Sequence, residues 1–104
     1  MPEHTLPPED TVRVARELVE AGRPFAAHEV LEARWKAGPA GETDLWQGLA
    51  QLAVGLTHKA RGNDIGAKRL IERGSDRLRS YMDTGSTTYD MDIAAVLQCV
   101  NRQD

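Results

Sequence analysis

The sequence predicts an all-α fold, a single multihelical bundle of about five helices built around a central apolar helix. Stretches of helix-forming residues are separated by glycines of the kind that follow helix C-termini. No segment shows the sustained alternation of apolar and polar residues that a half-buried strand requires, and β-branched residues are sparse. The chain has 104 residues, of which 40% are hydrophobic and 28% charged, and this composition suits one small globular domain.

Proline and glycine mark the boundaries of the predicted helices. Pro8 and Pro24 each stand where a first helical turn begins, a position that tolerates the missing N–H of proline. Gly22 and Gly62 follow helix-forming stretches and predict helix ends. These signals place helices at residues 8–21, 24–37, 43–61, 64–82 and 90–102. Residues 1–7 are expected to form a flexible N-terminal tail, which leaves 8–104 as one helical-bundle domain.

Segment 43–61 is expected to be the central, buried helix of the bundle. No charged residue occurs between Asp44 and Lys59, and apolar side chains cover most directions around this segment. A helix that is apolar on most sides is usually a buried one. Gly48 and Gly55 lie on one side of it, where the lack of a side chain would let a neighbouring helix approach.

The remaining helices are expected to pack around this central helix. Segments 8–21, 64–82 and 90–102 each carry one apolar stripe at helical spacing. Gly74 lies in the centre of the 64–82 stripe and predicts close approach of another helix, since glycine there costs about 1 kcal/mol relative to alanine. The central helix is more apolar than four amphipathic neighbours of this length can cover, so we expect the chain to form homodimers.

Segment 24–37 places polar residues within its apolar stripe. His28 and Glu32 share one face with the apolar side chains of Phe25 and Trp35. Glu29 flanks that face. A carboxylate in an apolar stripe is costly to bury unless it is paired, hydrogen-bonded, protonated or metal-bound. Trp35 is expected to be largely buried against the central helix, because it belongs to the same apolar stripe.

The central helix carries a matching set of polar residues. Gln47, Gln51 and His58 share one of its faces, whereas Trp46 lies at a different angle and is a candidate for a subunit contact. If this polar face packs against segment 24–37, its side chains need hydrogen-bond partners there. The expected cluster consists of His28, Glu32, Gln51 and His58, with Glu29 beside it and Trp35 and Gln47 in support.

Three interpretations of this cluster stay open at the level of sequence. Buried hydrogen bonds could fix the helix register, and the protein would then be a structural or interaction protein. His28, Glu32 and His58 could bind a divalent metal ion, because two histidines and one carboxylate suit Zn²⁺ or Fe²⁺. The cluster could instead bind a small molecule, with Glu29 or Glu32 acting as base if the protein is a small hydrolase or lyase. No catalytic residue is assigned.

The basic residues of segment 64–82 raise a separate alternative. Arg69, Arg73 and Arg77 follow one another at helical spacing and could contact phosphates. Glu72 and Asp76 lie on the same outer face within ion-pairing reach, so a solvated, ion-paired face is the favoured interpretation. The formal net charge of −3 likewise disfavours a general attraction to nucleic acid.

The chain is expected to reside in the cytoplasm. Its first residues lack the basic and apolar regions of a signal peptide. The longest uncharged run, residues 45–58, is too short and too polar to span a bilayer, so we expect no membrane partner. The single cysteine, Cys99, excludes an intramolecular disulfide and is expected to pack in the core.

Two groups of residues resemble an uncharacterised prokaryotic helical family that is known only as domain of unknown function number 309. The first group is the run FAAHEVLE at 25–32 followed by Trp35, and the second comprises QGL at 47–49, QLA at 51–53, His58, GN at 62–63, GA at 66–67 and RL at 69–70. The resemblance covers about residues 12–80 and implies an all-helical bundle with no established activity. It also implies that the family's recurrent positions correspond here to His28, Glu29, Glu32, Trp35, Gln47, Gln51 and His58.

Overall fold

The computed structural model describes residues 6–101, and over these residues the chain is all-α, as the sequence predicts. Its helices are α1 (Pro8–Glu20), α2 (Pro24–Ala37), the 3-10 helix η1 (Ala40–Glu42), α3 (Thr43–Ala60), α4 (Asp64–Asp83) and α5 (Ile93–Asn101). The first four predicted helices are confirmed to within one residue at each end. Helix α5 begins later than predicted because Tyr89 and Asp90 adopt φ angles of 52° and 65°, which no α-helix contains. Residue 102 and residues 1–5 of the expected tail lie outside the described residues.

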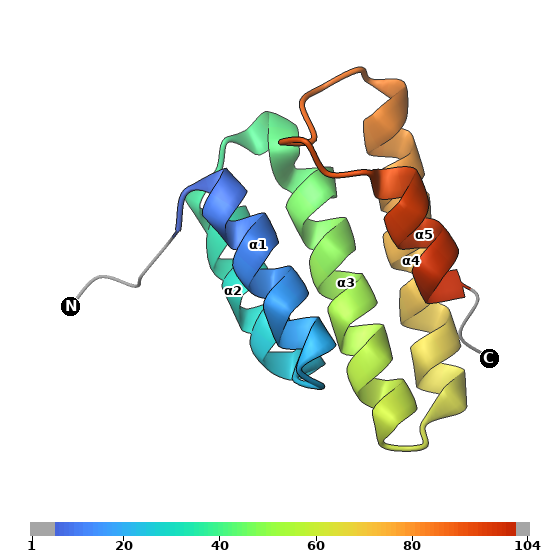
Figure 1. Ribbon diagram of the computed structural model, residues 1–104. Coiled ribbons are helices and arrows are strands. Elements are labelled where there is room, and N and C mark those ends of the chain that lie inside the picture. The colour runs from blue at the N-terminus through green and yellow to red at the C-terminus, as the bar shows by residue number, and fades with distance from the viewer. Residues whose placement is uncertain (1–5, 102–104) are drawn as a thin grey trace.

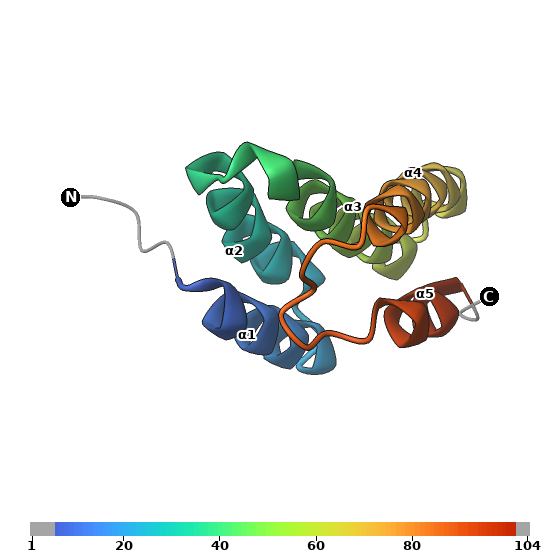
Figure 2. The ribbon, with the colours of Figure 1, turned by 90° about the horizontal axis from the view of Figure 1, so that it is seen from above.

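The helices form two layers. Helices α2, α3 and α4 lie side by side with α3 in the middle, and α1 and α5 both lie on the same side of that layer (Figures 1 and 2). Helix α1 packs on α2, and α5 packs on α4. The prediction that α3 is the central helix is therefore confirmed. Within residues 6–101, no helix is long and apolar enough to cross a membrane.

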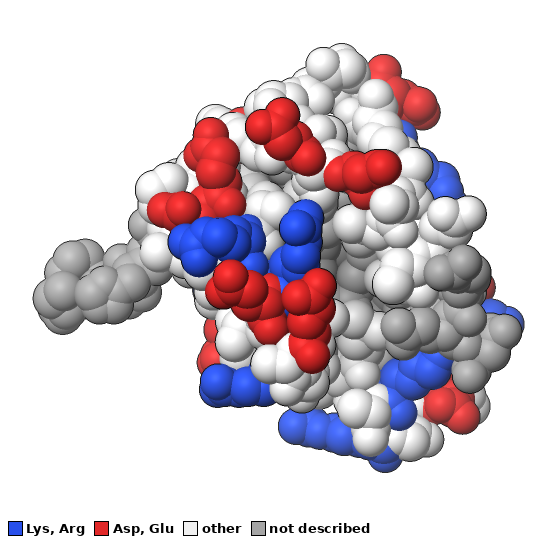
Figure 3. Space-filling view, viewed as in Figure 1, with Lys and Arg blue, Asp and Glu red and all other residues white. Residues whose placement is uncertain are grey.

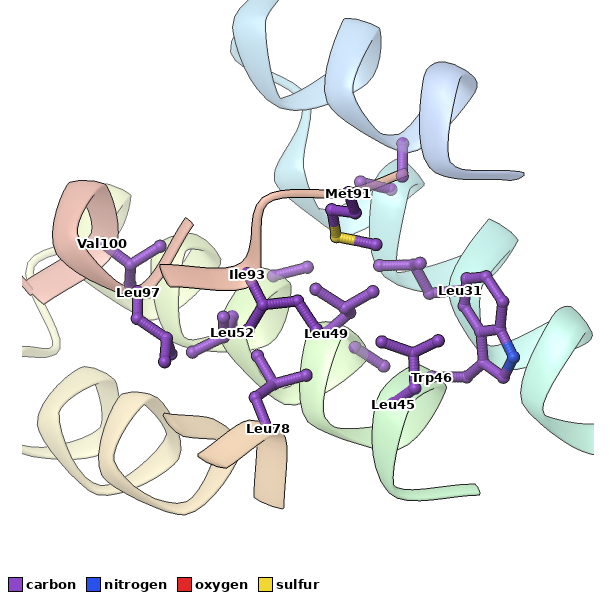
Figure 4. Packing of buried hydrophobic residues seen from close by; sticks show 14 of the residues in the cluster. Leu31, Leu45, Trp46, Leu49, Leu52, Leu78, Met91, Ile93, Leu97 and Val100 are labelled. Carbon is purple, nitrogen blue, oxygen red and sulfur yellow. The ribbon is translucent and has the colours of Figure 1, made fainter. Parts of the chain in front are cut away.

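The hydrophobic core follows α3. Leu45, Leu49 and Leu52 of α3 meet side chains from α2, α4 and α5 (Figure 4). Trp46 is 0% exposed, which corrects the expectation that it is available for a subunit contact. Its burial costs little because the indole Nε1 donates a hydrogen bond to Glu42 Oε1 at 3.0 Å.

Helices α3 and α4 approach each other at glycines, as predicted. A Cβ atom added at Gly74 would lie 2.7 Å from the backbone oxygen of Gly48, and one added at Gly48 would lie 3.1 Å from the backbone oxygen of Gly74. A Cβ atom at Gly55 would lie 2.8 Å from Ile71 Cγ1. Both helices therefore need these positions free of side chains to pack at their observed separation.

The segment between α4 and α5 crosses the end of the bundle and is fastened to the start of α3. The ring of Tyr89 stacks on that of Trp46, with 5.9 Å between the ring centroids. The Tyr89 hydroxyl donates a hydrogen bond to Glu42 Oε2, while Trp46 donates to the other oxygen of the same carboxylate. The hydrogen bond to Glu42, followed by burial, raises the pKa of Tyr89 to about 12. Glu42 thus joins two aromatic residues that lie far apart in the sequence.

Candidate functional site

Helix α2 brings two of the predicted site residues together. His28 Nε2 lies 4.0 Å from Glu32 Oε2, and Lys36 Nζ lies 3.9 Å from Glu32 Oε1. The side chain of His28 is 21% exposed and that of Glu32 is 37% exposed. The carboxylate therefore lies at the edge of the buried face rather than inside it, and solvent reduces the cost of its charge.

The buried face of α2 is rotated from the predicted one. Ala27 and Leu31 are 0% and 4% exposed, whereas Phe25, which was assigned to the apolar stripe, is 49% exposed. Trp35 is partly buried and packs against the core, so the expectation that it is largely buried is confirmed only in part. The difference arises because the small side chain of Ala27 lets α2 pack closely, while the larger aromatic side chains lie at the edges of the contact.

Gln47, Gln51 and His58 of α3 are half-buried, and the surroundings of Gln51 differ from those of His58. Oε1 of Gln51 is buried and has no hydrogen-bond partner within residues 6–101. His58 lies near the end of α3, where its Nδ1 is 3.4 Å from Nδ2 of Asn63. Asn63 caps α4, since its Oδ1 accepts a hydrogen bond from the backbone N–H of Gly66. His58 is thus tied to the turn between α3 and α4.

The predicted cluster residues lie on two neighbouring helices, α2 and α3. The structure pairs His28 with Glu32 on α2, and it pairs His58 with Asn63 at the end of α3. Nδ1 of His28 is buried without a hydrogen-bond partner in the described part of the chain, as is Oε1 of Gln51. Residues 6–101 contain no group of three or more His, Cys, Asp or Glu side chains placed to hold a metal ion.

Glu29 lines a hollow to which neither His28 nor Glu32 contributes. A hollow of about 390 Å³ opens between the start of α2 and the end of α3, and Glu29, Phe25 and Thr57 contribute to its lining. Arg23 and Arg61 also line it. Both arginines and Glu29 are exposed to solvent, so the hollow is an open surface feature rather than an enclosed site.

The basic residues of α4 have two different roles. Arg77 is half-buried, and its Nη1 lies 3.0 Å from Oδ1 of Asp44, so it ties α4 to the start of α3. Arg69 and Arg73 are exposed and make no ion pair with any residue of the described chain. Oδ1 of Asp76 lies 3.3 Å from Nη1 of Arg79, which is outside the predicted series of Arg69, Arg73 and Arg77. The expected ion-paired face is therefore formed only in part.

A second concave surface was not predicted. We call it the α1–α5 groove, a largely apolar cleft of about 380 Å³ that lies between α1 and α5 above α3. Its lining includes Val12, Ala15, Arg16, Val19 and Glu20 of α1, Leu49, Leu52, Ala53 and Leu56 of α3, and Asp92, Ala95, Val96, Cys99 and Val100 near α5. Cys99 is exposed there, which corrects its assignment to the core. The excess of apolar residues on α3 was the sequence signal for this surface.

The fold and its polar residues define a small all-α domain with a polar patch on two neighbouring helices. Residues 12–70, more than half of the chain, match the family described as "Domain of unknown function (DUF309)", and the chain belongs to that family. It is also similar to the "Uncharacterized protein YpuF" of Bacillus subtilis (strain 168), with 48% identity over 48 residues. That match covers 45% of this chain and 28% of YpuF, so the chain spans little more than a quarter of this relative. No solved structure matches the chain.

Proposed function

We propose that the domain is a binding module and that its ligand contacts the polar side chains of α2 and α3. The observation that supports this proposal is the pair of buried, unpartnered atoms, His28 Nδ1 and Gln51 Oε1, within the described chain. A buried polar atom without a partner costs about 1–3 kcal/mol. A ligand that hydrogen-bonds to these atoms recovers that free energy on binding.

The position of Gln51 separates this surface from the α1–α5 groove. Gln51 follows Leu49, which lines the groove, by two residues. Two residues correspond to about 200° around an α-helix, so Gln51 points to the other side of α3. The ligand is therefore expected to lie against the face of α2 and α3 that is turned away from α1 and α5.

The chemistry of the side chains favours an organic ligand with N–H or O–H donors. Glu32 offers carboxylate oxygens and Gln51 offers an amide oxygen, and all of these atoms accept hydrogen bonds. His28 and Glu32 together supply only two metal ligands, whereas zinc sites use three or four protein ligands. Lys36 Nζ lies near Glu32 and adds a positive charge that disfavours a cationic metal. The metal interpretation is therefore the second candidate.

A titration followed by NMR tests the proposal and separates its alternatives. Small alkylamines, guanidines and polyols are added to the ¹⁵N-labelled chain, and Zn²⁺ is added in a separate series. We expect the organic probes to shift the amide signals of His28, Glu32 and Gln51, and we expect Glu32→Gln to weaken these shifts. The matched control is Glu72→Gln, which changes an exposed carboxylate on α4.

The other outcomes identify the competing interpretations. Shifts of the same signals with Zn²⁺ alone, lost in Glu32→Gln, would establish the metal site in place of the organic ligand. If every probe leaves these signals unchanged at millimolar concentrations, the binding proposal is wrong and the polar residues only fix the fold. A response that is equal in Glu32→Gln and in the wild type would also contradict the proposed site.

A further inference from the structure

The α1–α5 groove exposes apolar surface that the domain does not cover by itself. Its floor is formed by aliphatic side chains of α3, including Leu49, Leu52 and Leu56. Val19 of α1 is 37% exposed at its edge. Figure 3 shows this face of the molecule: charged side chains of both signs gather around α1, and uncharged surface continues toward α5. Contiguous apolar surface with a polar rim is typical of a protein interface.

The lining of the groove argues against a small molecule as its occupant. Small-molecule sites combine an apolar lining with a few polar groups that orient the ligand. In the α1–α5 groove, the ionised side chains are Arg16, Glu20 and Asp92, which are all exposed. Charges of both signs at an exposed edge instead suit contacts with the charged rim of another protein surface.

The charges of α1 are arranged so that a second α1 could complement them. Arg13 already pairs with Asp10 at 3.3 Å and with Glu17 at 3.8 Å. Arg16 and Glu20 lie one helical turn apart and make no ion pair with any other described residue. Two antiparallel copies of α1 related by a twofold axis would place each Arg16 opposite Glu20 of the partner subunit.

We infer that the α1–α5 groove is covered by a second copy of this chain, whose α1 lies antiparallel to the first. Val12 and Val19 line the groove on its α1 side, and Val19 is 37% exposed, so apolar surface of α1 is available to the partner's α1. Each α1 then forms one wall of its own groove and covers the groove of its partner. This closed, self-complementary contact buries the leucines of α3 and pairs both unmatched charges of α1.

Analytical ultracentrifugation of the 104-residue chain tests this inference. The wild type is expected to sediment as a dimer, with twice the 11.5 kDa mass of the chain, at concentrations on the order of 100 µM. Arg16→Glu and Glu20→Arg each place like charges opposite each other, and each should raise the dimer dissociation constant about tenfold or more. The double variant Arg16→Glu/Glu20→Arg exchanges both charges, so it should dimerise like the wild type.

Two further measurements make the result decisive. Arg73→Glu, an exposed change on α4, should leave the dissociation constant unchanged, and circular dichroism should show that every variant is folded. The inference is overturned if the wild type stays monomeric, or if a dimer tolerates both single charge reversals. It is also overturned if the double variant fails to restore the dimer. Binding of a fluorescent apolar dye to a monomeric wild type would assign the groove to a small apolar ligand instead.

Discussion

A methyl group added at Gly74 tests the contact between α3 and α4. The new Cβ atom would lie 2.7 Å from the backbone oxygen of Gly48 and 3.0 Å from Cδ2 of Leu52. A leucine side chain can move, but a backbone oxygen moves only if the helix moves. Helix α4 would therefore have to move away from α3 by several tenths of an ångström to reach ordinary contact distance.

The expected loss of stability follows from two opposing contributions. Overpacking of a well-packed contact costs about 1–3 kcal/mol, and the upper half of that range applies to Gly74→Ala because the clash is with backbone. Alanine returns about 1 kcal/mol through its higher helix propensity. The free energy of unfolding should therefore fall by about 1–2 kcal/mol, which is a substantial fraction of the stability of a small domain.

Urea unfolding followed by circular dichroism measures this change. Gly41→Ala is the matched control, because a Cβ atom there meets nothing within 4 Å. The control should change the free energy of unfolding by less than about 0.5 kcal/mol. If Gly74→Ala is as stable as the wild type or more stable, the close approach of α3 and α4 at this position is refuted.

Three further predictions concern the aromatic residues and are measured by unfolding. Glu42→Ala leaves Trp46 Nε1 and the Tyr89 hydroxyl without their acceptor, so it should cost about 2–4 kcal/mol; an unchanged urea midpoint would show that this link is unimportant. Because the pKa of Tyr89 is raised to about 12, its contribution to stability is complete below about pH 10 and is lost as the pH rises toward 12. Tyr89→Phe should therefore lose less stability than the wild type as the pH rises toward 12. An identical pH profile of the free energy of unfolding in the two proteins would contradict this prediction. Trp46→Ala should cost about 3–5 kcal/mol, and Trp35→Ala clearly less because Trp35 is only half-buried; equal costs would contradict this ranking.

Local sequence signals were sufficient to predict the helices and their central element. Pro8 and Pro24 stand at the first residues of α1 and α2. The uncharged stretch between Asp44 and Lys59 lies within the central helix. The close contact at Gly74 was also predictable, because a glycine in the centre of an apolar stripe is costly unless another helix needs the space.

Features that depend on the packing of distant segments were not predictable. Glu42 and Tyr89 are joined across the fold, and no periodicity relates them. The rotation of α2 was missed because its buried face is marked by the small residue Ala27 rather than by Phe25. Of the polar cluster, the pairing of His28 with Glu32 follows from their spacing on one helix, whereas the surroundings of His58 depend on the turn that follows α3.

The free energy of unfolding of Gln51→Met tests the proposed binding role of the polar face most directly. Methionine matches the length of glutamine and removes the buried, unpartnered Oε1 atom. If Gln51 serves a ligand, this substitution should raise the free energy of unfolding of the ligand-free chain by about 1 kcal/mol. The control Gln98→Met, at an exposed position of α5, should change it by less than about 0.5 kcal/mol. A loss of about 1 kcal/mol or more in Gln51→Met would contradict the account, because it would show that the amide holds the fold together.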